Sequence, residues 1–330
     1  MQQRVLITGV AGFIGSNLIT PLLDKGYHII GVDNLSQGNI GNIEPFLKNP
    51  DFEFFKEDVK DLDSLKRLGK NIHSVIHLAA FKIPRYSDAM DTLLINTETT
   101  KNVLELARIN KSKLLLASTS DVYGKNTQIP FHENADSVIG NPTVKRWSYA
   151  ISKMYDEQLC FAYQSRYSFP TVIMRFFGSY GPNQHIGWWG GPQSVFIDSA
   201  LKQQALDIHG DGQQTRSFTY ISDTVNGIIR CLENEKANGE VINIGSTEEV
   251  TILYLANRIW KLTNGAESEP KIKMIPYETF GKYEDVMRRV PDIAKANRIL
   301  NFIPKVFLDN GLIKTIKWQK EYNELNAPID

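Results

Sequence analysis

The sequence predicts an α/β protein with a doubly wound parallel sheet, followed by a smaller C-terminal α/β domain. Short aliphatic or β-branched runs alternate with longer amphipathic segments, which is the pattern of β-α-β crossover units. The runs are nearly continuous rather than alternating, so both faces of the sheet should be buried. The expected strands are 4–8, 28–33, 52–58, 74–79, 113–118 and 171–176. The expected helices between them include 13–25, 91–109 and 148–166.

The texture of the chain changes after Arg175. The stretch GSYGPNQHIGWWGGPQ (178–193) is rich in Gly and Pro and carries two tryptophans, and it is too long and irregular for a simple connection. Helical segments then mix with expected strands at 240–245 and 271–276. We therefore expect a first domain over 1–177 and a second mainly over 178–330, with segments near 215–245 returning to the first.

Composition limits the class of protein. The 330 residues contain 37 Lys plus Arg and 37 Asp plus Glu, so no net positive charge attracts nucleic acid or an anionic membrane. The longest apolar stretches fall short of the ~20 residues of a membrane-spanning helix, and the chain enters a strand-like run at once, without the pattern of a signal peptide. Cys160 and Cys231 match no metal-ligand spacing. We expect a cytoplasmic protein with no metal, nucleic-acid or membrane partner.

A glycine triplet follows the first expected strand. Gly9, Gly12 and Gly15 in TGVAGFIGSNL have the spacing GxxGxxG and open the first helix, where close backbone approach and free amides favour a pyrophosphate. Turn and helix-packing glycines are the plainer alternative. Asp33 ends the second strand about 20 residues on, where an acid accepts hydrogen bonds from a ribose and repels a 2′-phosphate, which indicates NAD rather than NADP. Asp58 ends the third strand and is a candidate for the adenine amine or a solvated acid.

The segment WSYAISK places Tyr149 and Lys153 four residues apart on one helix face. A free tyrosine has a pKa near ~10 and is a poor base at neutral pH. A neighbouring ammonium and a positive nicotinamide ring both favour the phenolate, which makes the tyrosine able to take a proton from an alcohol. A tyrosine that only packs is the alternative for this short pattern.

Together, these segments resemble the extended short-chain dehydrogenase/reductases, in particular the NAD-dependent nucleotide-sugar epimerases and dehydratases. The resemblance runs through nearly the whole chain, in TGVAGFIGSNL, VDNLS, EDV, HLAA, STSDVYG, YAISK, RFFGSYGP, GDGQQTRSFTYISDTVNGI, VINIGS and RRVPDIAKA. It implies a Rossmann domain that binds NAD and a C-terminal domain that binds a nucleotide sugar. The cofactor residues implied are Gly9, Gly12, Phe13, Ile14, Gly15, Asp33, Asn34, Asp58, Val59, Leu78, Ala79, Ala80, Lys82, Tyr149 and Lys153.

The resemblance also implies a reaction. Hydride leaves the sugar 4-position for NAD, with Tyr149 as base, Lys153 tuning it and Thr119 aiding proton transfer. Dehydratases of the family carry Asp-Glu after that threonine, and uronic-acid decarboxylases carry Ser-Glu, whereas this chain has Ser120 and Asp121. Dehydration is therefore disfavoured, and epimerisation at the 4-position of a UDP-hexose or UDP-hexuronic acid is preferred over decarboxylation. The alternative to a catalytic role is that Asp121 only caps a turn.

Other residues correspond to the substrate site of the family. Arg216 and one of Arg288 or Arg289, with Arg289 the better match, align with arginines that clamp the diphosphate. Gly178 stands where the family has Asn or sometimes Thr, which puts the sugar specificity in doubt. Lys82 resembles a lysine near the cofactor phosphates, or is a surface lysine.

Three further expectations follow. His185, Trp188 and Trp189 are candidates for the sugar pocket, for packing or for a subunit contact. The family implies a homodimer through the helices at 91–109 and 148–166. An NAD-binding regulatory protein without turnover is an alternative of another class, opposed by the complete set of Thr119, Tyr149 and Lys153.

Overall fold

The computed structural model describes residues 2–82 and 88–326 and contains a seven-stranded parallel sheet. The strand order is β11-β6-β5-β4-β1-β2-β3, which confirms the predicted doubly wound fold. The strands are β1 (Arg4–Thr8), β2 (His28–Val32), β3 (Phe52–Phe55), β4 (Ser74–His77), β5 (Lys113–Thr119), β6 (Thr171–Phe176) and β11 (Val241–Ile244).

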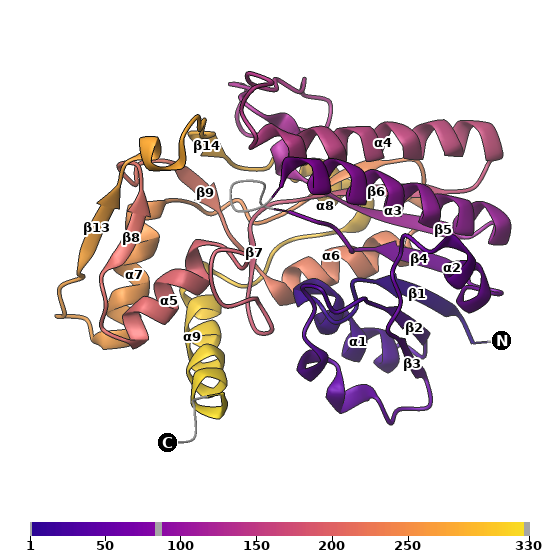
Figure 1. Cartoon of the computed structure of the whole chain (residues 1–330), viewed down its shortest axis with the longest axis horizontal. Coiled ribbons are helices and arrows are strands. Elements are labelled where there is room, and N and C mark those ends of the chain that lie inside the picture. The colour runs from indigo at the N-terminus through magenta and orange to yellow at the C-terminus, as the bar shows by residue number, and fades with distance from the viewer. Residues whose placement is uncertain (1, 83–87, 327–330) are drawn as a thin grey trace.

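Helices cover both faces of this sheet (Figure 1). One layer holds α2 (Leu62–Leu68), α3 (Ala89–Asn110) and α4 (Trp147–Tyr167), and the other holds α1 (Phe13–Asp24) and α6 (Ile221–Glu233). The nearly continuous apolar runs explain the two layers, because consecutive strand residues face opposite sides. In β1, for example, Val5 and Ile7 belong to one buried cluster and Leu6 to the other.

The second half of the chain forms a smaller α/β region beside the sheet (Figure 1). Its two- and three-stranded sheets have the orders β10-β7, β12-β9-β14 and β13-β8. The chain does not stay in this region, because β11 pairs with β6 at the edge of the large sheet and α8 packs on β11. The elements are β7 (Ser179–Tyr180), α5 (Pro192–Leu201), β8 (Leu206–His209), β9 (Thr215–Ser217), β10 (Thr219–Tyr220), β12 (Glu249–Thr251), α7 (Ile252–Asn264), β13 (Ile272–Ile275), β14 (Arg288–Arg289), α8 (Ala294–Leu300) and α9 (Leu308–Leu325).

The carboxyl ends of the parallel strands position the site. All seven strands point the same way, so the segments that follow β1, β2, β4 and β5 meet at one edge of the sheet. Two expected strands end at least two residues earlier than predicted: β3 stops at Phe55 and β4 at His77. Asp58 and the segment 78–80 therefore lie in loops at this edge rather than in strands.

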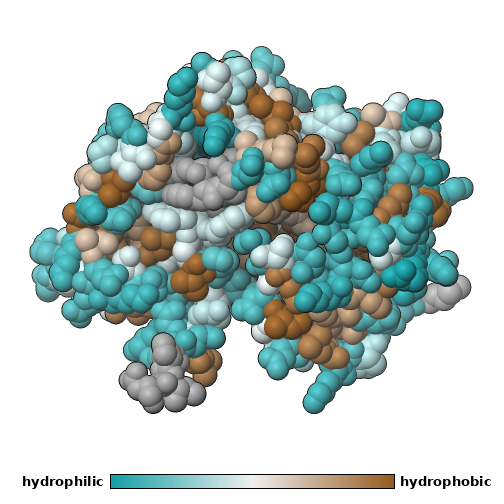
Figure 2. All heavy atoms as spheres, in the orientation of Figure 1, coloured by the Kyte–Doolittle hydropathy of each residue, from teal (hydrophilic) through white to brown (hydrophobic). Residues whose placement is uncertain are grey.

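The surface facing the viewer in Figure 2 is mostly hydrophilic, with apolar residues in small scattered groups. Within the described residues, no helix combines the length and apolar character needed to cross a membrane.

Candidate active site

The glycine loop between β1 and α1 is closely packed. Gly9 has a φ of +72°, and a Cβ there would lie 2.9 Å from the Ala79 nitrogen at the end of β4. A Cβ at Gly15 would lie 2.3 Å from the Gly9 carbonyl oxygen, so only glycine lets the helix approach the loop. Gly12 is the N-cap of α1 and no side chain caps the helix. The loop thus leaves backbone amides and the positive end of a helix dipole available to a pyrophosphate.

Asp33 directly follows β2 and ties its end to the glycine loop. Its buried carboxylate accepts hydrogen bonds from the Ala11 amide at 3.0 Å and the Leu35 amide at 2.8 Å. Burial raises the pKa of Asp33, and these two bonds oppose the rise. The Asn34 side-chain nitrogen donates to the Asp58 carboxylate at 3.2 Å, which joins the loops after β2 and β3. Asp33, Asn34 and Asp58 therefore lie together, as an adenosine site in this fold requires.

The remaining predicted cofactor residues lie around the same edge. Phe13 and Ile14 are half-buried in the first turn of α1, while Val59 is buried and its carbonyl accepts a bond from Asn102 of α3. The Leu78 and Ala79 amides donate to the Thr8 hydroxyl at 3.2 and 3.3 Å, which turns the chain after β4, and Ala80 is exposed.

Lys82 lies in a pocket beside Asp121 and Tyr149. Partial desolvation lowers the pKa of Lys82, which nevertheless remains exposed to solvent, and the charge of Asp121 opposes this effect. Lys82 was predicted to lie near the cofactor phosphates or to be a surface lysine, and the residue is exposed at the edge of the pocket that it lines with Asp121.

Tyr149 and Lys153 lie in the first two turns of α4. Tyr149 lines the pocket, whereas Lys153 is buried and its ammonium forms a 3.2 Å ion pair with Asp156. Burial, Asp121 and Asp156 raise the pKa of Tyr149, and Arg289 lowers it. In the protein alone, the tyrosine is therefore held in its protonated form.

The hydroxyl-rich end of β5 is a capped turn. The Thr119 hydroxyl accepts a bond from the Asp121 amide at 3.1 Å and caps the 3₁₀ turn Ser120–Tyr123. Ser118 donates to Glu157 of α4, and Ser120 is buried. This turn directs the Asp121 side chain into the pocket with Tyr149.

A partly buried charge cluster fills one wall of the pocket. Asp121 pairs with Arg289 and, at 3.1 Å, with Arg146. Asp285 pairs with Arg216 at 2.9 Å and with Arg146 at 3.6 Å. With three arginines and two carboxylates, the cluster keeps an excess positive charge that suits an anionic substrate.

The cluster alters the titration of its own members. Burial acts to raise the pKa of Asp121, but Arg289, Arg146 and Arg216 outweigh it and lower the pKa. Burial also acts to raise the pKa of Asp285, but Arg216 and Arg146 lower it well below its ordinary value. Burial lowers the pKa of Arg216 to about 10, against the effect of Asp285. Both acids are ionised at neutral pH.

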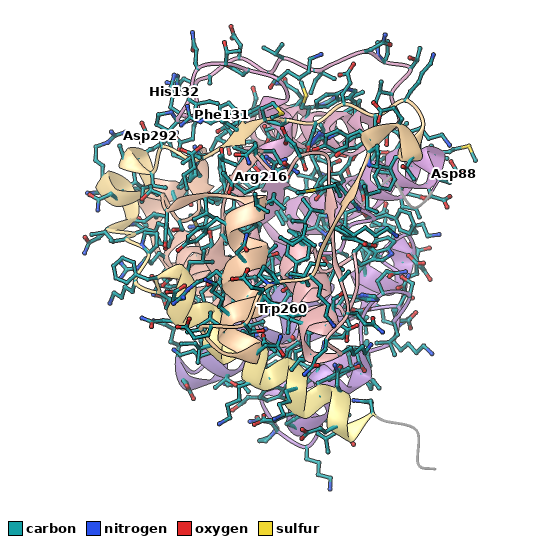
Figure 3. All side chains as sticks on the ribbon, turned by 90° about the vertical axis from the view of Figure 1, so that its left-hand side faces the viewer. Asp88, Phe131, His132, Arg216, Trp260 and Asp292 are labelled. Carbon is teal, nitrogen blue, oxygen red and sulfur yellow. The ribbon has the colours of Figure 1, made fainter. Side chains whose placement is uncertain are left out.

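The sequence motifs did not indicate Arg146 or Asp285 as site residues. Arg146 immediately precedes WSYAISK, and Asp285 lies four residues before Arg289, so charged residues flanking the motifs were the available signal. Figure 3 shows Arg216 inside the molecule, with Phe131 and Asp292 near one another above it. The Asp292 amide donates to the Phe131 carbonyl at 2.8 Å, which ties the segment after β14 to the segment after β5.

The pocket has a cavity volume of about 370 Å³. Trp188 lines it and stacks on His209, with ring centroids 4.2 Å apart. Trp189 instead packs edge-on against Phe81, and His185 is exposed. Of the three candidates in this loop, only Trp188 lines the cavity.

Gly178 also lines the cavity. A Cβ there would lie 2.8 Å from the Ser217 carbonyl oxygen and 3.2 Å from the Phe218 ring. The family Asn or Thr would not fit without a shift of β9. The described residues contain no group of three or more His, Cys, Asp or Glu side chains that could hold a metal ion.

The sequence and the fold were compared with known proteins. The family model described as GDP-mannose 4,6 dehydratase matches residues 6–315. The chain belongs to the extended short-chain dehydrogenase/reductase family of nucleotide-sugar epimerases and dehydratases. This confirms the resemblance drawn from the motifs.

Relatives of this chain within the family include decarboxylases. UDP-N-acetyl-α-D-glucosaminuronate decarboxylase of Bacillus cytotoxicus is 38% identical over 325 residues, covering 97% of this chain and 99% of that protein. UDP-glucuronic acid decarboxylase 1 of Danio rerio is 35% identical, covering 96% and 72%.

Solved structures in the family share the whole fold. UDP-glucuronic acid 4-epimerase from Bacillus cereus, in complex with UDP-glucuronic acid and NAD, has a TM-score of 0.87 and 31% identity, covering 97% of this chain and 100% of that one. An epimerase from Methanothermobacter thermautotrophicus has a TM-score of 0.89 and 32% identity, covering 98% and 94%. NAD is the cofactor of this family, which confirms the prediction of NAD.

Proposed function

We propose that this protein is an NAD-dependent decarboxylase of a UDP-linked hexuronic acid, which acts through a 4-keto sugar. The observation that carries the proposal is the pairing of Asp121 with Arg289 in the pocket that Tyr149 lines. Asp121 occupies the position after Thr119 and Ser120 at which the decarboxylases of the family carry an acid. The excess positive charge of the arginine cluster suits a substrate with both a diphosphate and a carboxylate.

The first step oxidises the 4-hydroxyl of the sugar. NAD, held by the glycine loop and Asp33, would supply the hydride acceptor, and its positive ring would oppose the rise in the pKa of Tyr149. The Tyr149 oxygen takes the hydroxyl proton as the carbon–oxygen double bond forms. Thr119 ends β5 beside Asp121, and we assign to it the passage of this proton.

The second step breaks the bond between carbon 5 and the carboxylate. The carboxylate lies beta to the new ketone. The electron pair of the breaking carbon–carbon bond therefore moves into an enolate as neutral carbon dioxide leaves. The excess positive charge of the arginine cluster attracts the substrate carboxylate into the site, and the ionised Asp121 repels it there. Because the repulsion disappears when neutral carbon dioxide forms, Asp121 favours the transition state over the bound substrate. A proton added to carbon 5 then gives a 4-keto pentose. Return of the hydride to carbon 4, with the proton given back by Tyr149 to the oxygen, would restore the 4-hydroxyl and the oxidised cofactor.

Epimerisation at the 4-position is the second candidate. It uses the same oxidation and then returns the hydride to the other face of the ketone. The likeness to UDP-glucuronic acid 4-epimerase supports it, whereas the decarboxylase relative has the higher identity. Both candidates take a hexuronic acid, and they separate only after the 4-keto stage.

The test incubates the purified protein and NAD with UDP-glucuronate and, separately, with UDP-N-acetylglucosaminuronate. Product mass and sugar proton NMR are followed, with release of labelled carbon dioxide from carboxyl-labelled substrate. We expect loss of carbon dioxide from at least one substrate. A product of unchanged mass with an inverted 4-position would establish the epimerase instead, and no turnover despite bound NAD would favour a regulatory protein.

We also propose that the protein is a homodimer through α3 and α4. Met90 and Leu94 on α3 and Ile151 on α4 are exposed apolar residues at 60%, 57% and 41%, and contact between two copies would bury them. Light scattering of the wild type and of Leu94→Glu tests this, with a monomer expected only for the variant. A monomeric wild type would contradict it.

A further inference from the structure

A buried ion pair lies on α4 within two turns of Tyr149. The ammonium of Lys153 is 3.2 Å from Oδ2 of Asp156, and the two side chains are 2% and 0% exposed. A buried ammonium without a partner tends to lose its proton, and a buried carboxylate tends to gain one. The pair is therefore what allows both charges to exist at this depth.

The pair and Tyr149 share one stripe of α4. At 3.6 residues per turn, Tyr149, Lys153 and Asp156 fall within about 60° of the helix circumference. Asp156 lies two turns from the tyrosine, with Lys153 between them, and its charge raises the pKa of Tyr149. The Lys153 ammonium thus has an anion within contact distance, on the same stripe of the helix as Tyr149.

Other groups around the pair set its electrostatic surroundings. Glu157 and Cys160 of α4 both interact with Asp156, but Glu157 is already bound by Arg175 of β6. Oδ1 of Asp156 lacks a hydrogen bond of good geometry within the described residues.

Two groups approach from neighbouring elements. The neutral Thr100 hydroxyl of α3 lies near Asp156. His77 at the end of β4 interacts with Lys153, and burial followed by the lysine charge keeps the pKa of His77 well below its usual range. His77 is therefore neutral, so Asp156 is the anion that acts directly on the ammonium.

We propose that Asp156 is a positioning residue, which holds the Lys153 ammonium in a buried pair and so limits the action of the lysine charge on the Tyr149 hydroxyl. Tyr149 then stays protonated until a positive nicotinamide ring adds its charge. The inference rests on the proposed function only through the oxidation step, which decarboxylation and epimerisation share.

The test measures the titration of Tyr149 directly. Wild type, Asp156→Asn and Tyr149→Phe are prepared with isotope-labelled tyrosine and saturated with NAD, and the Tyr149 resonance is identified by its loss in Tyr149→Phe. We expect the midpoint of Tyr149 to fall by about one pH unit in Asp156→Asn, because a like charge has been removed. The acid limb of kcat/KM should move by the same amount.

Controls separate this role from folding. Asp198→Asn removes an acid from another pair within a helix, Asp198 with Lys202 at 2.7 Å, and should leave the midpoint unchanged. If Asp156→Asn does not fold, Asp156→Ser leaves room for a water molecule beside the ammonium and is measured instead. An unchanged or higher midpoint in a folded variant would overturn the proposal. The NMR midpoint does not depend on which product forms, so this failure is distinct from failure of the proposed reaction.

Discussion

Asp121 and Arg289 form an ion pair between residues 168 positions apart in the chain. Asp121 follows β5 of the large sheet, and Arg289 belongs to β14 of the smaller region. The pair joins the part of the chain that carries Tyr149 to the part that carries Arg216 and Arg289 of the pocket wall.

Replacement of Arg289 tests the anionic-substrate site. We expect Arg289→Gln to lower kcat/KM for a UDP-hexuronic acid about a hundredfold, because one partner of a partly buried charge pair is lost. Arg288→Gln is the matched control, since Arg288 is adjacent but exposed and pairs with Glu249, and its kcat/KM should change little. Equal losses in both variants would contradict the role of Arg289. Steady-state kinetics with each variant give the comparison.

Replacement of Asp121 tests the branch point. We expect Asp121→Asn to lose carbon dioxide release by about a hundredfold while still oxidising the sugar, because the amide no longer repels the substrate carboxylate. Asp121→Glu keeps the charge and should retain the reaction. Product analysis by mass and NMR separates the two outcomes, and full decarboxylation by Asp121→Asn would remove this acid from the mechanism.

The pH dependence of turnover tests the base. Burial, Asp121 and Asp156 raise the pKa of Tyr149, so the phenolate is the minor form below that pKa and kcat/KM should rise with pH, by about tenfold per unit. Tyr149→Phe should lower kcat by about 10²- to 10⁴-fold and abolish this limb. Tyr155→Phe changes an exposed tyrosine on the same helix and should preserve the profile. A rate independent of pH in the wild type would argue against Tyr149.

Replacement of Gly178 tests how closely the pocket wall is packed at this residue. We expect Gly178→Asn to lower the free energy of unfolding by about 1–3 kcal/mol and to raise KM, because its Cβ meets the Ser217 carbonyl. Gly41→Ala is the control, since the nearest atom there is the end of the Asn39 side chain. Thermal denaturation and KM are measured for both. An unchanged melting temperature in Gly178→Asn would show that β9 yields easily.

Replacement of Asp285 tests how much the charge cluster contributes to the free energy of unfolding. Arg216 and Arg146 outweigh burial and depress the pKa of Asp285, so its contribution is complete above the unfolded pKa of about 4 and is lost as the pH falls below it. We expect Asp285→Asn to cost about 3 kcal/mol of the free energy of unfolding at neutral pH. The difference from wild type should shrink in acid. Urea denaturation over a range of pH checks this, with exposed Asp211→Asn as control.

Much of the fold could be predicted from the sequence, because the strands of a buried parallel sheet are continuous apolar runs that can be recognised directly. β1 and β6 have the predicted bounds. The ends of β3 and β4 were predicted too late. The residues just after each strand are apolar or polar like those within it, although they no longer pair with a neighbouring strand. Leu78 and Ala79, for instance, bond to Thr8 instead of extending the strand.

The candidate site was harder to predict. Residues within motifs, such as Tyr149 and Lys153, could be named from their spacing. Arg146 and Asp285 belong to an ion-pair cluster built from distant segments. A local sequence pattern cannot predict which distant segments come into contact. The sequence favoured epimerisation over decarboxylation, and the placement of Asp121 together with the decarboxylase relative reverses that order in our proposal.

The return of β11 to the large sheet has a consequence for dissection of the protein. The Asn243 side chain in β11 bonds to the Tyr123 hydroxyl and to the Phe131 and Asp292 carbonyls. A fragment ending near residue 177 would lose this strand and leave the backbone of β6 unpaired along an apolar edge, which favours aggregation. Truncation should therefore give insoluble material, and the intact chain should unfold in one cooperative transition.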